Sequence, residues 1–222
     1  MKKKLSQEML KLIACVTMLL DHIGATILPS TGLRMIGRAS FPIFCFLLAE
    51  GIAYTRNPKK YGLRLLIGAL LAEIPFDLLF YGRLTFEHQN VMVTLLLGFL
   101  MAQWMKKTGN IMLPFAVCFL SAEFLNTDYG GFGVVLIALF YISREHPQKF
   151  LIQLIGLAVT MCMMNSMEVA IGLVRVPIQL FALLAMVPIY FYSGEKTTQN
   201  VWIQRAFYLF YPVHLAILLL LK

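Results

Sequence analysis

Charged residues and long hydrophilic segments are scarce in this sequence. Only 14% of its 222 residues are Asp, Glu, Lys or Arg, whereas soluble proteins contain about 25%. The longest hydrophilic stretch covers residues 193–205, which is too short to fold as a domain of its own. Hydrophobic residues make up 59% of the chain, and the mean hydropathy is +0.77. These proportions exclude a soluble domain and predict a polytopic membrane protein whose chemistry takes place within its apolar segments.

The cysteines and histidines lack the spacing of a disulfide framework or a metal site. All four cysteines lie inside apolar segments, so we interpret them as small buried hydrophobic residues: Cys15, Cys45, Cys118 and Cys162. The four histidines are scattered, and no two have the close spacing of a helical metal site: His22, His88, His146 and His214. We therefore expect no bound metal.

Low-complexity tracts, internal repeats and shifts in composition are also missing, which favours one integral-membrane domain over residues 1–222. The net charge of +8 is a feature that nucleic-acid-binding proteins share. The basic residues lie in short loops between apolar runs, however, and this distribution is typical of orientation in a membrane. We expect membrane lipid, and no nucleic acid, as a partner.

Turn residues and charges divide the chain into about nine apolar segments, each a predicted helix. The first segment follows a run of lysines, as a signal peptide would, but it is too long and has no small-residue cleavage site. Several segments are shorter than the roughly 20 residues that span a bilayer, so we predict an all-α transmembrane bundle of about eight to ten spans. The segments are 9–29, 33–55, 63–81, 91–105, 111–126, 130–143, 149–166, 175–192 and 206–221.

Basic residues are distributed unequally between the two ends of these segments. With the N-terminus in the cytoplasm, only five of the 19 lysines and arginines fall on the outer side: Arg34, Arg38, Arg83, Arg175 and Lys222. Cytoplasmic loops of membrane proteins are enriched in Lys and Arg. We therefore predict a multi-pass protein with a cytoplasmic N-terminus and with Lys222 outside.

The first predicted helix contains two ionisable residues, Asp21 and His22, in the run LKLIACVTMLLDHIG. A helix that begins near Met9 places this pair roughly 18 Å along its axis, past the middle of a ~30 Å hydrocarbon core. Ionisable groups at this depth are costly unless they face protein or water, so we interpret the pair as a functional site. Arg38 is the predicted ion-pair partner of Asp21, whereas Arg34 is expected to reach the outer headgroups.

Two carboxylates share one face of the third segment, RLLIGALLAEIPFDLL. Glu73 and Asp77 are four residues apart, and Pro75 between them bends the helix. Carboxylates this close cannot both remain charged in a low dielectric without a cation. We expect either that one of them is protonated or that Arg38 is their partner.

Four further residues are predicted to contact an acceptor substrate. Asn90 opens the fourth segment, where it could equally cap the helix. Asp128 and Tyr129 belong to a flexible Gly-rich turn, DYGGFG, at the outer side. His214 lies two residues after Pro212 in the last segment, and it has a second interpretation as a structural histidine.

Basic residues gather at the cytoplasmic ends of the second to fifth segments. This cluster suits a phosphorylated ligand, although anionic lipid or orientation in the membrane would also account for it. Acidic residues gather instead from the middle of the membrane outward. The sequence therefore indicates two ligands, an anionic cofactor from inside and an acceptor from outside. The basic residues are Arg56, Lys59, Lys60, Arg64, Lys106 and Lys107.

Six runs of the sequence, taken in order, resemble the TraX-like family of bacterial membrane proteins over nearly the whole chain. They are LKLIACVTMLLDHIG, IGRASFPIFCFLLAEGIAYTRNPKKY, RLLIGALLAEIPFDLL, QNVMVTLLLG, DYGGFGVV and FYPVH. The resemblance implies an acetyltransferase of the bacterial inner membrane, whose founding activity is N-terminal acetylation of conjugative pilin. It also implies membership of a wider clan of membrane acyltransferases that use acetyl-CoA and a histidine on an early helix, the position that His22 matches.

In the mechanism that this resemblance implies, His22 is the general base that deprotonates the acceptor as it attacks the thioester carbonyl. Asp21 is ~100° round the helix from His22, so it cannot lie under the imidazole. The orienting acid is expected to be Glu73 or Asp77. Arg38 either pairs with Asp21 or stabilises the oxyanion, and an acetyl-His22 intermediate stays open.

The acceptor and two rival functions also stay open at this point. The acceptor is an amine or hydroxyl at the outer side of the membrane, on a protein N-terminus such as that of pilin or on an envelope glycan or lipid. One rival is a proton-coupled transporter or flippase, in which the same buried residues relay protons. The other is a non-catalytic envelope assembly protein whose polar residues serve contacts between helices.

Overall fold

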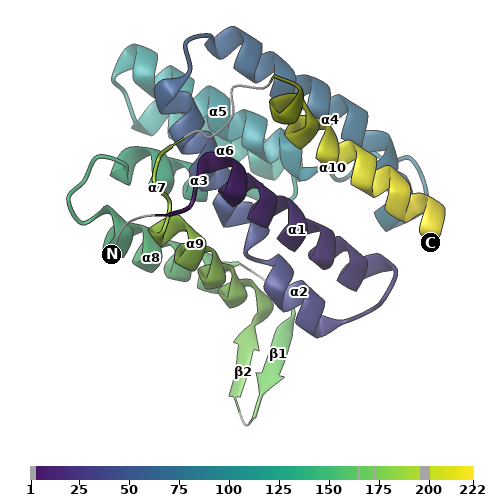
Figure 1. Ribbon diagram of the computed structural model, residues 1–222. Coiled ribbons are helices and arrows are strands. Elements are labelled where there is room, and N and C mark those ends of the chain that lie inside the picture. The colour runs from purple at the N-terminus through teal and green to yellow at the C-terminus, as the bar shows by residue number, and fades with distance from the viewer. Residues whose placement is uncertain (1–3, 165, 173, 196–200) are drawn as a thin grey trace.

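Helices dominate the computed structural model, and most of them begin and end close to the predicted segments (Figure 1). The structure describes residues 4–164, 166–172, 174–195 and 201–222, with backbone alone for 201–205. Lys2, Lys3 and Lys196, which the charge analysis assigned to the cytoplasmic side, lie outside the described residues. The elements are α1 (Gln7–Thr26), α2 (Thr31–Gly37), α3 (Ser40–Tyr54), α4 (Pro58–Tyr81), α5 (Val91–Thr108), α6 (Met112–Phe124), α7 (Gly130–Ser143), α8 (Lys149–Met163), β1 (Glu168–Ile171), β2 (Val174–Pro177), the 3₁₀ helix η1 (Ile178–Ala185), α9 (Met186–Tyr190) and α10 (Val201–Leu221).

Short polar side chains and glycines set the helix ends. The hydroxyl of Ser6 accepts a hydrogen bond from the backbone at the start of α1, and the Asn57 side chain does the same for α4. Pro58 follows as the first residue of α4, where its missing N–H costs nothing. Asn90 caps α5, and Gly82 ends α4 with a left-handed φ of 68°.

Two predicted segments differ from the structure. The second is broken at residues 38–39 into α2 and α3, which places Arg38 at the junction. The eighth was predicted as a helix from residue 175, and this is wrong, because β2 occupies 174–177. β1 and β2 form an antiparallel hairpin with Ile171 opposite Val174, and it projects from the bundle (Figure 1). The alternation of Val and Arg in this stretch suits a strand, and Pro177 ends it. The prediction of an all-helical bundle is otherwise confirmed.

α1 packs against α2, α3 and α10, and α10 lies along α4 (Figure 1). The helices α5, α6 and α7 pack together, and α7 joins them to α3 and α8. Fully buried side chains fill the space between these helices, among them Leu10 of α1, Ile43 and Ile52 of α3, Phe140 of α7 and Leu215 of α10. The helices around α1 therefore frame the part of the bundle that contains Asp21 and His22.

Two helices of the described chain are long and apolar enough to cross a membrane. They are α1, with 20 residues, and the unit Thr31–Tyr54, with 24. α4 is as long and exposes Leu66, Leu70 and Ile74 along one face. Shorter apolar helices include α6, α7 and α8. The structure thus supports two candidate spans, and the count of about nine stays a prediction.

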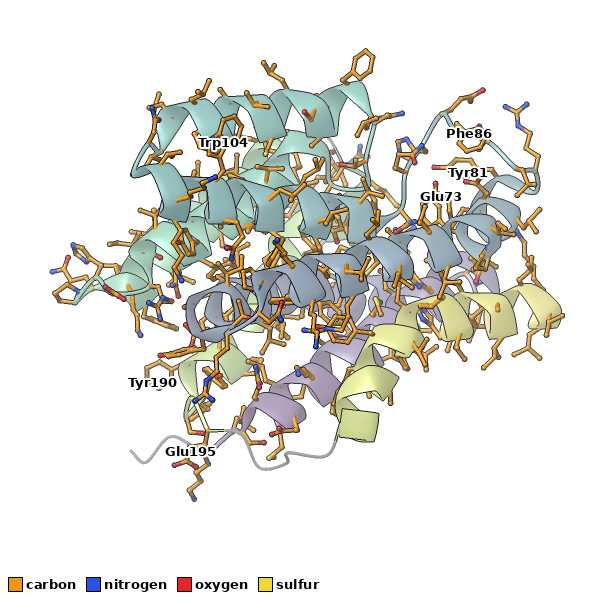
Figure 2. All side chains as sticks on the ribbon, turned by 90° about the horizontal axis from the view of Figure 1, so that it is seen from above. Glu73, Tyr81, Phe86, Trp104, Tyr190 and Glu195 are labelled. Carbon is orange, nitrogen blue, oxygen red and sulfur yellow. The ribbon has the colours of Figure 1, made fainter. Side chains whose placement is uncertain are left out.

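The two ends of the bundle carry different parts of the chain. Tyr81 and Phe86 lie at one end, and Tyr190 and Glu195 lie at the other (Figure 2). Tyr81 is the last residue of α4, with Phe86 in the loop that follows, and Tyr190 is the last residue of α9, with Glu195 after it. The loop after α4 and the residues just after α9 thus lie at opposite ends of the bundle (Figure 2), and which end faces the cytoplasm stays a prediction.

α1 and α2 approach each other closely at Gly37. A Cβ added to Gly37 would lie 2.2 Å from Cβ of Asp21 and 2.6 Å from its Cα. We expect Gly37→Ala to separate the two helices and lower the free energy of unfolding by about 1–3 kcal/mol. Gly32→Ala in the same helix is the control, since the nearest atom to its added Cβ is 3.9 Å away. Chemical unfolding of the detergent-solubilised variants measures both, and equal stability would contradict this packing.

Candidate functional site

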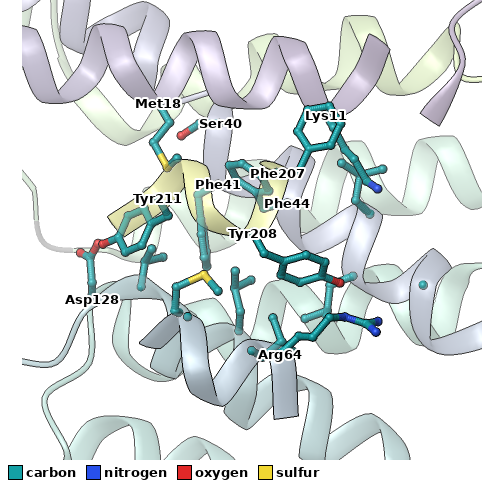
Figure 3. A pocket seen from close by; sticks show the side chains of 18 of the residues that line it. Lys11, Met18, Ser40, Phe41, Phe44, Arg64, Asp128, Phe207, Tyr208 and Tyr211 are labelled. Atoms are coloured by element: carbon teal, nitrogen blue, oxygen red, sulfur yellow. The ribbon is translucent and has the colours of Figure 1, made fainter. Parts of the chain in front are cut away.

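A cavity of about 1360 Å³ lies between α1, α3, α4 and α10. Its lining joins two groups of residues that the sequence analysis assigned to different ligands. In Figure 3, Asp128 and Tyr211 are on one side of the cavity, and Lys11, Arg64, Phe207 and Tyr208 are on the other. The predicted site residues along its wall are Asp21, His22, Arg38, Lys60, Arg64, Asp128 and Tyr129.

An ion pair between Asp21 and Arg38 lies at the first end of the cavity. Nε of Arg38 donates to Oδ1 of Asp21 over 3.2 Å, Nη2 donates to Oδ2, and both residues are buried. The predicted partnership is therefore confirmed. Arg34 was expected to point to the headgroups, and this is wrong, because its Nε lies 3.7 Å from Oδ1 of Asp21. One carboxylate thus balances two guanidinium groups.

Tyr129 ties this pair to the turn between α6 and α7. Its hydroxyl accepts a hydrogen bond of 3.4 Å from Nη1 of Arg38. Its ring stacks on Phe41 of α3 with centroids 3.8 Å apart. Tyr129 also has a left-handed φ of 67°, which is rare for a bulky residue, and strained backbone of this kind clusters at functional sites.

Asp128 lies in the same turn and contributes a carboxylate to the cavity wall. Its backbone is fixed from two sides, because its N–H donates to Gln89 O over 2.8 Å and its carbonyl accepts from the Thr94 hydroxyl. Burial raises the pKa of the Asp128 carboxyl, and the positive charge of Arg38 partly offsets this rise.

His22 contacts a second histidine from the far end of the chain. Its Nδ1 lies 2.7 Å from Nε2 of His214, and the two rings are stacked with centroids 4.9 Å apart. The predicted orienting carboxylates are engaged elsewhere: Asp77 accepts from the backbone N–H of Thr85 over 2.8 Å, and Glu73 accepts from Asn90. The expectation that Glu73 or Asp77 orients His22 is therefore wrong.

Asn90 has a structural position in the fold. Its side chain accepts from the backbone N–H of Met92 over 2.9 Å and donates to the carbonyl of Ala69 over the same distance. It is fully buried and is not among the cavity-lining residues that the structure describes. Of the two interpretations of Asn90, the geometry supports the helix cap.

The second end of the cavity combines cations with aromatic rings. Lys60 and Arg64 line it, and the Arg64 guanidinium lies 5.4 Å from the ring centroid of Tyr61 and 5.2 Å from that of Tyr208. Lys11 lies 5.3 Å from the ring centroid of Phe207. These contacts are within the range of cation–π interactions.

Lys11 and the aromatic residues of this end were not predicted from the sequence. The signal for Lys11 was available, because Lys11 and His22 are 11 residues apart, close to three helical turns, and so share one face of α1. The other predicted cofactor residues do not reach the cavity wall among the described residues. Arg56 and Lys59 are exposed before and at the start of α4, and Lys106 and Lys107 are exposed in the last turn of α5.

The site presents an acid–base pair, a buried guanidinium and a cationic aromatic pocket in one continuous space. In the described part of the chain, no three His, Cys, Asp or Glu side chains are grouped closely enough to hold a metal ion. An imidazole beside a buried guanidinium can support proton transfer and charge stabilisation.

Comparison with known proteins extends over nearly the whole chain. The family model described as TraX protein matches residues 6–222. Probable fimbrial assembly protein FimC, serogroup H1, of Dichelobacter nodosus is 33% identical over 228 residues, which cover 94% of this chain and 92% of that protein. An uncharacterized protein of Rickettsia prowazekii is 34% identical over 93 residues, which cover 41% of this chain and 34% of that protein. No solved structure matches.

Removing either arginine tests the charge balance around Asp21. Arg38→Ala leaves a buried carboxylate with Arg34 alone at 3.7 Å, so we expect it to lower the free energy of unfolding by about 3–5 kcal/mol. Arg34→Ala is the control, and it should cost no more than about 1 kcal/mol, because this ion pair is longer and the Arg34 side chain is 30% exposed, against 9% for Arg38. Denaturant unfolding in detergent measures both, and a larger loss for Arg34→Ala would contradict the assignment of Arg38 as the main partner.

Proposed function

This chain belongs to the TraX protein family, and from its site we propose that it is a membrane-embedded acetyltransferase that uses acetyl-CoA. The observation that carries the proposal is the single cavity with His22 at one end and Lys60 and Arg64 at the other. A general base and a cationic nucleotide pocket are the two features that acetyl transfer from a nucleotide thioester requires.

The dimensions of the cavity suit the donor. Lys11 and His22 are separated by 11 residues of α1, or roughly 16 Å at ~1.5 Å per residue. The pantetheine arm of acetyl-CoA reaches on the order of 15–20 Å when extended. Phosphates held by Lys11, Lys60 and Arg64 would thus leave the thioester near His22. The ring of Tyr208 offers a surface on which the adenine can stack.

The proposed reaction is direct transfer. Nε2 of His22 takes the proton of the acceptor amine or hydroxyl as that group attacks the thioester carbonyl. The new bond to carbon forms, the carbon–sulfur bond breaks, and the proton passes from His22 to the departing thiolate. Arg38 is already held by Asp21 and Tyr129. Arg34, whose Nε makes no hydrogen bond within the described chain, is the better placed donor to the oxyanion.

The acceptor approaches the opposite end of the cavity, where Tyr81, His88 and Asp128 form the wall. One relative carries the name of a probable fimbrial assembly protein. We propose by analogy that the acceptor is an amine on a fimbrial subunit outside the cytoplasmic membrane. An enzyme that acetylates a fimbrial subunit would itself take part in fimbrial assembly. A role in assembly therefore does not require that the protein be non-catalytic.

The orientation in the membrane follows from the same geometry. Acetyl-CoA is a cytoplasmic metabolite, so the end with Lys11, Lys60 and Arg64 faces the cytoplasm and the N-terminus of α1 lies on that side. The turn with Asp128 and the loop with His88 then face outward. The chain is thus proposed to be a multi-pass protein of the bacterial inner membrane, in agreement with the distribution of Lys and Arg.

Radiolabelled acetyl-CoA distinguishes an enzyme from a transporter or an assembly factor. We expect the purified wild-type protein to label a fimbrial-subunit peptide, or to hydrolyse the thioester, and His22→Ala to lower this rate about 10²–10⁴-fold because the general base is lost. His146→Ala is the control, since His146 is exposed in the loop before α8. A wild-type protein without thioester turnover would contradict the proposal, and so would an equally active His22→Ala variant.

Neighbouring basic residues test the donor pocket. Lys60→Ala and Arg64→Ala should each raise the KM for acetyl-CoA about 10-fold with little change in kcat, because a charge-assisted contact to a phosphate contributes about 1.5–3 kcal/mol. Lys59→Ala and Arg56→Ala carry the same charge change outside the cavity wall and should alter KM less than about 2-fold. Equal increases in all four variants would assign the effect to general charge and contradict the pocket.

A further inference from the structure

Three groups lie in a row that ends at the proposed base: the carbonyl of Phe210, the ring of His214 and the ring of His22. Nδ1 of His214 is 2.8 Å from the Phe210 oxygen. Nε2 of His214 is 2.7 Å from Nδ1 of His22. Both distances are those of hydrogen bonds, and each ring nitrogen between the carbonyl and His22 is therefore engaged.

The carbonyl fixes the direction of these hydrogen bonds. A carbonyl oxygen only accepts, so Nδ1 of His214 carries a hydrogen and donates it to Phe210. In a neutral imidazole the other nitrogen is then an acceptor, and Nε2 of His214 accepts from Nδ1 of His22. The lone pair of His22 is consequently on Nε2, the nitrogen that does not face His214.

We propose that His214 is a positioning residue that holds His22 as the Nδ1–H tautomer and thereby aims its basic Nε2 at the acceptor. This inference rests on the proposed acetyl transfer. It replaces the carboxylate expected from the sequence with a second histidine, and it differs from the predicted role of His214 in substrate binding. In a histidine ring, the hydrogen-bond partner of one nitrogen decides whether the other nitrogen is protonated.

His214 lies behind His22 and outside the cavity wall. The residue is 4% exposed, and it is not among the described residues that line the cavity. The Phe210 ring stacks on its ring with centroids 4.9 Å apart, and the Tyr211 ring lies at 5.6 Å. On the other side, Phe80 contacts His22 edge to face at 5.5 Å. Both imidazoles are thus restrained against rotation.

The proton balance of the reaction is unchanged by this arrangement. The acceptor proton moves to Nε2 of His22, whose Nδ1–H remains donated to His214. The same Nε2 proton then leaves with the thiolate sulfur. His214 stays neutral throughout, and the cation formed on His22 is stabilised by the lone pair of His214 Nε2.

Two substitutions of similar size separate this role from packing. Glutamine places an amide oxygen the same number of bonds from Cβ as Nε2 of histidine, so His214→Gln retains an acceptor for His22. His214→Met fills the same space with an apolar chain. We expect kcat to fall at least about 100-fold in His214→Met and less than about 10-fold in His214→Gln, with the KM for acetyl-CoA unchanged in both. Equal losses in the two variants would overturn the proposal.

The double variant distinguishes an effect through His22 from a general one. In a His22→Ala background, His214→Met should cause no further loss of the residual rate, because the group that it positions is absent. An additional loss of about 100-fold there would assign His214 a structural role and overturn the proposal.

The tautomer can also be measured without turnover. NMR of ¹⁵N-histidine-labelled protein should show His22 protonated on Nδ1 in the wild type, with this signature lost in His214→Met and retained in His214→Gln. The His22 signals are those missing from His22→Ala. An Nε2–H tautomer in the wild type would overturn the inference, whatever the result of the acetyl-CoA assay. Failure of wild-type acetyl transfer with the expected tautomer would instead contradict the proposed function.

Discussion

Burial of the Asp21 carboxylate imposes the strongest constraint on this fold. An ionised carboxylate inside an apolar bundle is tolerated only when cations and hydrogen-bond donors surround it. α1 must therefore lie against the junction of α2 and α3, where Arg38 reaches both carboxylate oxygens. Gly37 permits that approach, and Tyr129 carries the contact onward to the α6–α7 turn. One ion pair thus sets the relative positions of α1, α2, α3 and the turn that holds Asp128.

The polar groups of the bundle are separated by task. Asn90 and Glu73 hold the start of α5 against α4, and Asp77 holds the loop after α4. These contacts maintain the wall of the cavity, whereas the residues that face its interior are the ion pair, His22 and the cationic aromatic end. In an apolar surrounding, buried polar groups need hydrogen-bond partners within the bundle, and a polar residue can serve that need alone. Its depth in a helix is therefore not by itself evidence of catalysis.

Local patterns in the sequence were sufficient for the helices and for part of the site. Hydrophobic runs, turn residues and charges located most segments, and the depth of Asp21 and His22 in the first run marked the site, because these signals depend on neighbouring residues alone. Periodicity could not locate the hairpin after α8, where alternating Val and Arg resembled the start of an apolar run. The contact of His22 with His214 joins residues 192 positions apart, and no short-range rule links them. Charge alone could not separate Lys60 from Lys59, since only the direction of each side chain decides which reaches the cavity.

α10 contributes Tyr208 to the cavity wall beside Arg64, and its His214 contacts His22 from behind that wall. Lys222 anchors the end of α10 through a 2.8 Å hydrogen bond to the Leu79 carbonyl. Helices inserted earlier during synthesis therefore contain every other part of the site without completing it. A chain in which α10 has not yet been synthesised and packed lacks one wall of the donor pocket and the partner of His22. Under the proposed function, a nascent or stalled chain would not consume acetyl-CoA, and activity would begin only when α10 docks against α1 and α4.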